Sequence, residues 1–229
     1  MFRLEPSMPI YSFKIGNFPI NITKEIIIQW VVILILWIGA SLLTRNLKQN
    51  PSKKQAALEK IYESIKTLVN STMGEGYERF IPYIGTLIVY LLVLNFTGLI
   101  GIPPATQNLS VTIGLAITTF LVVNINAIKK NGPGGYLKGL SHPYFVMLPI
   151  NIMERLVLPV SLALRLFGNM LAATILVDLV YQALGKVAMI AQIGAPIIVH
   201  GYFDLFDGSI QMLVFTMLTM INIKTTAEH

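Results

Sequence analysis

The stretch PINIMERLVLPVSLALRLFGNMLAATILVDLVYQAL, residues 149–184, is predominantly apolar and decides the class of fold. Read as one helix, its ~36 residues extend over about 54 Å, nearly twice the ~30 Å hydrocarbon core of a bilayer. The usual helix tilt of about 20° does not absorb that length. We therefore predict a helix that is steeply tilted or broken, with Pro159 permitting a bend. A segment of similar length follows at residues 187–223, and Gly185-Lys186 predicts the turn between the two.

Composition places the rest of the chain in the membrane as well. Of the 229 residues 54% are hydrophobic and only 12% are charged, and the mean hydropathy is +0.67. A soluble domain carries about 25% charged residues. Three further apolar runs, at residues 26–43, 80–102 and 109–128, are each long enough to cross a bilayer. The chain has no cysteine, which excludes disulfides and thiolate metal sites.

The net charge of +6 is distributed as a topology signal rather than as a nucleic-acid surface. Basic residues follow the first run and recur at Lys129-Lys130, whereas the connector at residues 103–108 has none. Loops rich in Lys and Arg remain cytoplasmic. We therefore expect the N-terminus outside, the C-terminus in the cytoplasm and no nucleic-acid partner. The basic residues after the first run are Arg45, Lys48, Lys53 and Lys54.

Residues 55–75 differ from the apolar runs because their apolar side chains lie on one face. Charged residues lie mainly off that stripe, which is typical of an amphipathic helix on the cytoplasmic membrane surface or against a neighbouring helix. The stripe consists of Leu58, Ile61, Tyr62, Ile65, Leu68 and Val69.

These patterns together predict an all-α integral membrane protein. It has five membrane-crossing helices and one amphipathic surface helix, and the last two crossings form a long, steeply tilted hairpin. Residues 1–23 form an N-terminal external segment, and residues 24–229 form a single membrane domain. The parts of that domain are the first helix at 24–45, the surface helix at 55–75, a hairpin at 80–130 and the long hairpin at 147–224.

Arg165 is the most informative single residue, because it lies inside an apolar stretch with no acidic residue within one helical turn. A guanidinium at membrane depth costs several kcal/mol or more, and it cannot lose its proton to avoid that cost. Such a residue indicates a partner that needs the charge.

Polar residues form a stripe on each of the two long segments, since residues three, four, seven and eleven apart share a helix face. Asp178 lies about 220° around the helix from Arg165, at ~100° per residue. Alternatives remain open: Asn169 and Gln211 as hydrogen bonds between helices, His200 as a packing residue, and an Asp204–Arg165 ion pair. The first stripe holds Glu154, Ser161, Leu162, Arg165, Asn169 and Ala172, and the second holds His200, Asp204, Asp207 and Gln211.

The residue types favour ion transfer over catalysis. There is no compact metal-ligand set, no Ser-His-Asp arrangement and no P-loop, since residues 132–135 lack the Lys-Ser/Thr of that motif. Carboxylates and histidine relay protons, or their oxygens pass sodium, while a fixed cation prevents conduction straight through. We expect no cofactor, no metal centre and no catalytic site.

Residues 161–170, SLALRLFGNM, resemble the S-L-x-L-R-L-F-G-N pattern of the family of F-type ATP synthase subunit a. Further stretches resemble that family in order, and the resemblance covers the chain from Lys24 onward. They are PYIGT at 82–86, NFTGLI at 95–100, SIQ at 209–211 and FTMLTM at 215–220.

The resemblance implies an ion-conducting stator subunit of a rotary motor, embedded in membrane lipid. Arg165 would face the rotating c-ring and separate two offset half-channels, and Asn169 and Gln211 would line the ring contact. The implied partners are the c-ring of proteolipid subunit c, peripheral-stalk subunit b and the rest of the ATP synthase. The transported ion is H⁺ or Na⁺. A bacterial plasma membrane is the expected location, although an organelle-encoded chain would look similar.

The sequence departs from the family pattern at two channel positions. Thr174 occupies the position, nine residues after the arginine, where many members carry Glu. Asp204 lies seven residues before Gln211, where some members carry His. We interpret this as a rearrangement in which Asp204 performs the relay, with Asp178 as a second acid near the outer end.

Two other functional classes are weighed against the stator. A stand-alone secondary ion transporter or antiporter would explain buried charge, but it usually has duplicated halves, and no second Arg-Leu-Phe-Gly-Asn-like half is present. A membrane-embedded hydrolase lacks a nucleophile arrangement. Copurification with a proteolipid ring separates the stator from both.

Overall fold

The computed structural model describes residues 10–15, 18–45, 48–49, 52–140, 145–187 and 201–228. Helices account for nearly all of this structure, which confirms the all-α class. Among the described residues, five helices are long and apolar enough to cross a membrane. Their ranges are Lys24–Thr44, Glu78–Ile100, Leu109–Tyr136, Leu148–Leu184 and Gly201–Glu228.

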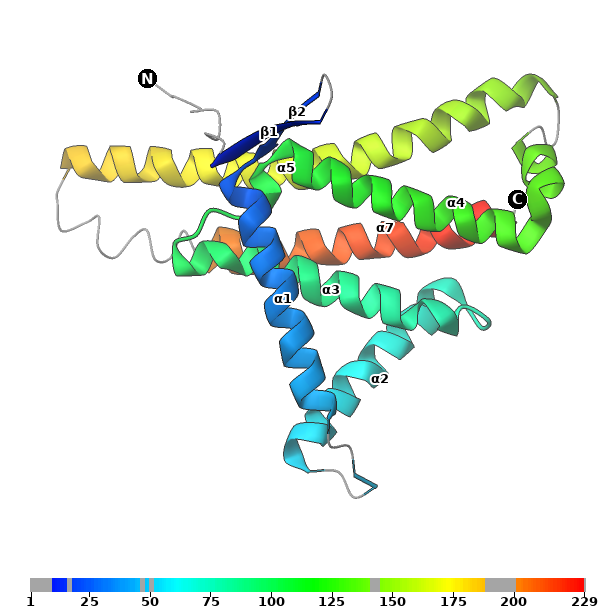
Figure 1. Cartoon of the computed structure of the whole chain (residues 1–229), viewed down its shortest axis with the longest axis horizontal. Coiled ribbons are helices and arrows are strands. Elements are labelled where there is room, and N and C mark those ends of the chain that lie inside the picture. Colours follow the sequence, from blue (N-terminus) through cyan, green and yellow to red (C-terminus); the bar gives the residue numbers. More distant parts are fainter. Residues whose placement is uncertain are drawn as a thin grey trace.

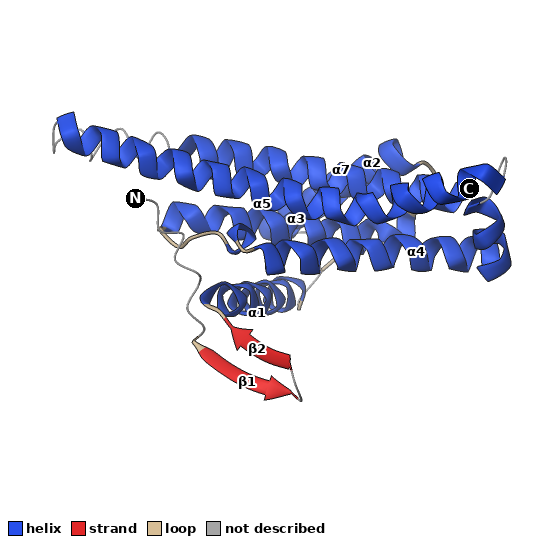
Figure 2. Cartoon of the chain, turned by 90° about the horizontal axis from the view of Figure 1, so that it is seen from above, coloured by secondary structure: helices blue, strands red, loops and turns tan. Residues whose placement is uncertain are grey.

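The N-terminal segment contains an element that the sequence analysis does not predict. Strands β1 (Tyr11–Ile15) and β2 (Phe18–Ile22) pair antiparallel, with Tyr11 opposite Ile22 and Ile15 opposite Phe18. The hairpin lies beyond α1, on the side of α1 that faces away from the other helices (Figure 2). The hairpin therefore does not interrupt the bundle of membrane helices (Figure 2).

Helices α1 (Lys24–Thr44) and α2 (Lys53–Met73) are the first two helices of the chain. The β-branched and aromatic side chains of α1 point outward almost everywhere, and Val32 is its buried contact. Helix α2 begins after Ser52, whose hydroxyl oxygen accepts a hydrogen bond from the Gln55 backbone N–H at 3.4 Å, a typical N-cap. This is the predicted amphipathic helix, and it starts two residues earlier than expected.

Helices α3 (Ile81–Phe96) and α4 (Leu109–Leu140) form the predicted inner hairpin. Two short 3₁₀ turns, Thr97–Ile100 and Ala105–Gln107, connect them. The Gly- and Pro-rich run after Lys129-Lys130 contains a kink, because Gly132 has a backbone φ of 71° that only glycine adopts freely. Helical hydrogen bonding resumes beyond the kink, so α4 is longer than predicted.

The last pair of helices comprises α5 (Leu148–Val187) and α7 (Gly208–Glu228), the latter preceded by a π-helical segment, Gly201–Asp207. The prediction of a turn at Gly185-Lys186 is wrong, because α5 continues through both residues. A helix in an apolar medium persists where its backbone groups have no other hydrogen-bond partner. Pro159 also lies within α5. The predicted start of the last segment, residue 187, is the last residue of α5, and residues 188–200 lie outside the described part of the chain.

The helices are not parallel to one another. In Figure 1, α1 runs crosswise to α3, α4, α5 and α7, which lie side by side. Upright, the 21 residues of α1 span about 32 Å, close to the ~30 Å hydrocarbon core. Helices α5 and α7 lie across the direction of α1 (Figure 1). Their steep tilt in a bilayer stays a prediction from their length.

The core lies where α3, α4, α5 and α7 meet. A cluster of buried side chains joins the four helices, with Phe215 of α7 fully buried at its centre. Helix α2 covers a second cluster on α3, α4 and α7, and α1 packs against α3, the Ala105–Gln107 turn and the start of α4. The first cluster consists of Leu87, Leu91, Ala116, Leu162, Ala163, Leu166, Met212 and Phe215.

Candidate functional site

Arg165 lies near the middle of α5 and is half-buried. Its neighbours Leu162, Ala163 and Leu166 point into the four-helix core and are 1–3% exposed. Within the described part of the chain, Arg165 forms no ion pair and no hydrogen bond. The Asp204–Arg165 pair weighed above is therefore not formed, and the guanidinium is available to a group outside this chain.

Asn169 and Gln211 join α5 to α7 one turn away from Arg165. The Asn169 side-chain amide donates a hydrogen bond to Gln211 Oε1 at 2.6 Å. Gln211 is 4% exposed, and its Nε2 has no hydrogen-bond partner among the described residues. The Asn169–Gln211 hydrogen bond thus connects the two helices, while Gln211 Nε2 remains an unused donor one turn along from Arg165.

A cavity of about 260 Å³, the Asp204 cavity, lies at one end of the α5/α7 pair. Three of the predicted residues, Asp178, Thr174 and Asp204, line it together. The Gln107 side-chain amide also lines it and donates to the Thr174 hydroxyl oxygen at 2.5 Å. The helical spacing that separates Asp178 from the Arg165 face therefore turns it toward Asp204.

Asp204 is only 7% exposed, and the 3₁₀ turn Thr97–Ile100 makes room for its carboxylate at Gly98. A Cβ atom at Gly98 would lie 2.7 Å from Asp204 Cγ and from both carboxylate oxygens, closer than real Cβ atoms come. Asn95, one turn earlier, donates to the Gly208 carbonyl at 2.9 Å and accepts from the Thr106 hydroxyl at 3.4 Å. Asn95 thereby holds the point where the π-helical segment ends and α7 begins.

A second cavity of about 480 Å³, the Glu154 cavity, lies at the other end of the same helix pair. Glu154 and Arg155 of α5 line it, and the guanidinium carbon of Arg155 lies 4.4 Å from the centre of the Tyr136 ring, a cation–π contact. The remaining polar lining residues are Asn151, Asn222, Thr225 and Thr226.

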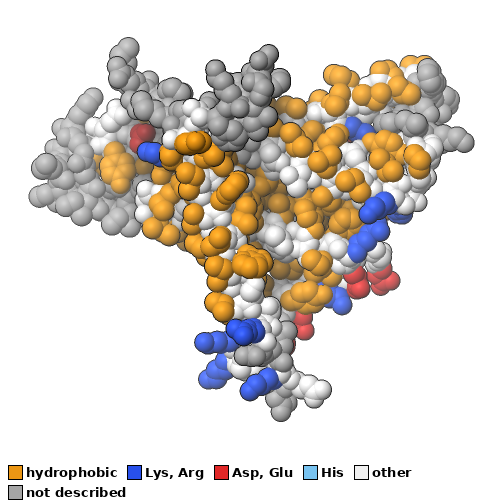
Figure 3. Space-filling view, in the orientation of Figure 1, with side chains coloured by type: hydrophobic (Ala, Val, Ile, Leu, Met, Phe, Trp, Pro, Cys, Tyr) orange, Lys and Arg blue, Asp and Glu red, His pale blue; other side chains and the backbone are white. Residues whose placement is uncertain are grey.

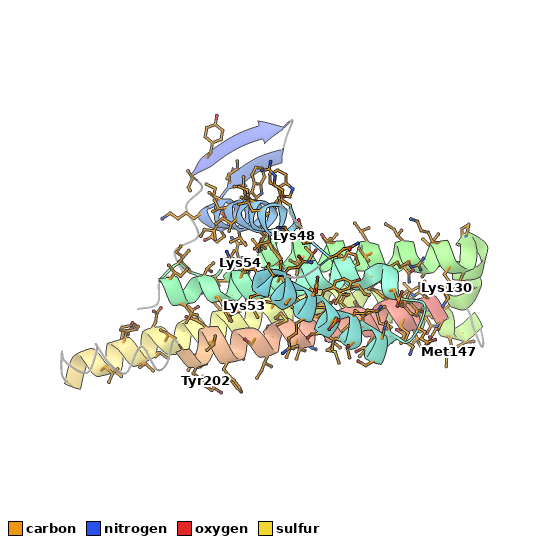
Figure 4. All side chains as sticks on the ribbon, turned by 90° about the horizontal axis from the view of Figure 1, so that it is seen from below. Lys48, Lys53, Lys54, Lys130, Met147 and Tyr202 are labelled. Atoms are coloured by element: carbon orange, nitrogen blue, oxygen red, sulfur yellow. The ribbon has the colours of Figure 1, made fainter. Side chains whose placement is uncertain are left out.

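The two cavities are separated along both helices. On α5 the Glu154 cavity extends to Leu158 and the Asp204 cavity begins at Met170, a separation of about 18 Å at the standard rise. Figure 4 labels Met147, in the lining of the Glu154 cavity, and Tyr202, on the π-helical segment, near opposite ends of the helix pair. The buried core cluster fills the interval, and Arg165 lies there. Polar cavities are thus present at both ends of the α5/α7 pair, whereas apolar side chains fill the interval between them.

Some predicted residues do not join either cavity. Ser161 and Ala172 are exposed on the outer face of α5, Leu162 is buried in the core, and Asp207 is half-buried without lining a cavity. His200 lies outside the described residues. In the described part of the chain, no three His, Asp or Glu side chains gather as a metal site would require.

Three residues of the site are not found by sequence reasoning. Gly98 and Gln107 lie in the α3–α4 connection, whose position against α5 and α7 is a tertiary property. Arg155 is different, because a second cation in the long apolar segment is visible in the sequence, where the adjacent Glu154 makes it less conspicuous than Arg165.

Known proteins resemble this chain over nearly its whole length. A family model described as ATP synthase A chain matches residues 26–224. ATP synthase subunit a 1 of Crocosphaera subtropica is 37% identical, over 90% of this chain and 87% of its own. The sodium ion specific ATP synthase subunit a of Propionigenium modestum is 34% identical, over 97% and 78%. ATP synthase subunit a of Moorella thermoacetica is 34% identical, over 93% of each.

Proposed function

Because the chain belongs to the ATP synthase subunit a family, a multi-pass membrane component of ATP synthase, we propose that it is the ion-conducting stator of a rotary F-type enzyme. It carries H⁺ or Na⁺ to and from a carboxylate on a rotating c-ring, and nucleotide chemistry belongs to other subunits. The arrangement of two polar cavities around one unpaired arginine is the observation that carries this proposal.

In this proposal the Asp204 cavity and the Glu154 cavity are the two half-channels. An ion enters one cavity, binds a ring carboxylate, and leaves through the other cavity after the ring has turned. The apolar interval of about 18 Å between the cavities on α5 supports this reading, because an ion cannot cross it without the ring. The offset along tilted helices is what converts ion flow into rotation.

Arg165 would act at the point between the two paths. A ring carboxylate that has lost its ion is negative, and a guanidinium without an internal partner stabilises it there. The same fixed charge repels cations and so prevents leak between the half-channels. Asn169 and Gln211 would line the ring contact, and the unused Gln211 donor supports that role.

Asp204 would be the ion-relay group of its half-channel. It is buried, it shares the cavity with Asp178 and Thr174, and the 3₁₀ turn after α3 approaches it closely at Gly98. The connector that lines this cavity lacks basic residues, which supports an outer opening. The Glu154 cavity would open to the cytoplasm, with the C-terminus on that side. A bacterial plasma membrane and a peripheral-stalk partner, subunit b, complete the proposal.

The test is Arg165→Ala in the whole complex, reconstituted in vesicles, with gradient-driven ATP synthesis and passive ion leak measured on the same preparation. We expect synthesis to be lost while the c-ring still copurifies, and we expect the leak to rise. Arg165→Lys is the comparison, since it keeps a charge but loses the planar, bidentate guanidinium. Normal synthesis without leak in Arg165→Ala would overturn the role of Arg165 as the separator.

A further inference from the structure

An apolar groove of about 660 Å³ lies between α1, α2 and α3, away from both half-channels. Figure 1 shows α1 and α2 diverging from the segment that joins them, with α3 across the open side. The lining side chains are almost all apolar, and several are more than half exposed, including Trp37 at 70% and Ile61 at 54%. An apolar groove of this size needs a covering molecule that is itself apolar.

The closed end of this groove carries a concentration of positive charge. Between residues 45 and 55 the chain has four basic residues and no acidic one, namely Arg45, Lys48, Lys53 and Lys54. All four are exposed. Figure 3 shows Lys and Arg side chains gathered at the foot of α1 and α2, directly below the hydrophobic surface of α1.

A set of hydrogen bonds holds the two basic stretches together. The Gln55 side chain of α2 accepts from the Lys48 backbone N–H at 3.0 Å and donates to the Lys48 carbonyl at 2.8 Å. The same amide donates to Glu59 Oε1 at 2.8 Å. The connector after α1 is therefore fixed against the first turn of α2, which brings Lys48 to the residues around Lys54 (Figure 4).

Helical spacing divides the lysines of α2 into two sets. Lys54 lies four and seven residues before Leu58 and Ile61, which line the groove, so it shares the groove face. Lys53 and Lys60 lie roughly 130° or more around the helix from that face, at ~100° per residue. The groove thus has its own basic group, and the opposite side of the same helix provides a matched pair of lysines.

We propose that the groove binds one anionic phospholipid, with acyl chains between α1 and α2 and the phosphate held by Arg45, Lys48 and Lys54. Upright, α1 places its apolar length in the hydrocarbon layer and its basic end at headgroup depth. A basic cluster directly after a membrane helix is the usual recognition element for anionic lipids. A transmembrane helix of another subunit would fill the apolar part but would leave the basic end without an anion.

Photolabelling of the intact complex tests the proposal without relying on ion transport, so its outcome is independent of the proposed function. The complex is reconstituted in phosphatidylcholine vesicles that contain a phosphatidylglycerol probe with a photoreactive acyl chain, or the same probe with a phosphatidylcholine headgroup. We expect the phosphatidylglycerol probe to label the α1 and α2 peptides that line the groove, and to do so roughly tenfold more than the other probe.

Two double variants separate the site from general surface charge. Lys48→Gln/Lys54→Gln should reduce phosphatidylglycerol labelling by roughly tenfold, whereas Lys53→Gln/Lys60→Gln removes the same charge and should retain most of it. Ala40→Phe, which narrows the groove and keeps every charge, should also reduce labelling.

Three results would overturn the proposal. Equal labelling by the two probes would mean ordinary bilayer lipid, and an equal loss in the two double variants would mean nonspecific attraction. Absence of lipid label in the groove, with crosslinks to another subunit there instead, would mean that a protein helix covers it.

Discussion

The two cavities at the ends of the α5/α7 pair are built from different kinds of backbone and carry different charges. Irregular segments surround the Asp204 cavity: the two 3₁₀ turns after α3 and the π-helical turn before α7. Apart from Tyr181, the ionisable groups that line this cavity are the carboxylates of Asp178 and Asp204. Regular helix supplies most of the Glu154 cavity, which is lined by both a carboxylate, Glu154, and a guanidinium, Arg155.

This difference follows from what an apolar medium permits. Irregular backbone is tolerated at membrane depth only where it is buried in protein or lines a polar cavity. A π-helical turn also re-aims the side chains that follow it and is frequent at functional sites. The Asp204 cavity therefore depends on close tertiary fit, whereas the Glu154 cavity depends on which side chains regular helices present. Substitutions should affect the two cavities unequally.

The largest effect within the cavities should come from Asp204. Because Asp204 is buried and Asp178 is exposed, Asp204→Asn should slow ion transport about 10²-fold or more, and Asp178→Asn less than about threefold, since a positioned proton-transfer group contributes ~10²–10⁴-fold. The measurement is gradient-driven ATP synthesis by reconstituted complexes containing equal amounts of subunit. Wild-type rates in both variants would refute Asp204 as the relay, and equal losses would make the two acids a joint relay.

A smaller but substantial effect is expected from Gly98→Ala. The added methyl would contact the Asp204 carboxylate at 2.7 Å, and such overpacking costs about 1–3 kcal/mol. The lower part of that range, about 1.4 kcal/mol, corresponds to roughly tenfold slower transport. Gly114→Ala in α4 is the matched control, because a Cβ there meets nothing within 4 Å.

A double-mutant cycle sharpens this second prediction. In an Asp204→Ala background the carboxylate is absent, so Gly98→Ala should have little further effect on transport. An undiminished effect in that background would show that Gly98 acts on the backbone fold and not through Asp204.

The smallest effect is expected in the Glu154 cavity. Arg155→Gln removes a cation–π contact worth about 0.5–1 kcal/mol, so transport should fall about two- to fivefold. Tyr136→Leu should produce a similar loss, and Tyr136→Phe, which keeps the ring, should not. A loss from Arg155→Gln as large as that from Asp204→Asn would erase the proposed difference between the cavities.

Periodicity predicted the helices well because the bilayer leaves the backbone few alternatives. It placed Arg165 and Asn169 on related faces of one long helix and Asp178 on another side. It failed at Gly185-Lys186, where a turn signal from soluble proteins lies within the continuous helix α5. It also missed the β1–β2 hairpin, although two short apolar-rich runs flank Gly16-Asn17, a recognised hairpin signal.

The candidate site was predicted less completely than the fold. Sequence spacing grouped Arg165 with Asn169, and the family resemblance added Gln211. The structure adds that Asn169 and Gln211 share a hydrogen bond, while Arg165 has no partner among the described residues. The same spacing did not predict that Asp178 and Asp204 line one cavity with Thr174, since the three residues come from two helices that meet only in the fold.

By itself the sequence determined that this chain is a helical membrane protein, that its last helices are too long to stand upright, and that one unneutralised arginine lies inside them. Those properties follow from composition, length and local spacing, which act through the neighbouring residues of a single helix. Only the tertiary structure decided that the polar residues divide into two cavities, and that Asn95 of α3 and Gly98 and Gln107 of the α3–α4 connection shape one of them. Such contacts depend on the registers of packed helices, which no local pattern specifies.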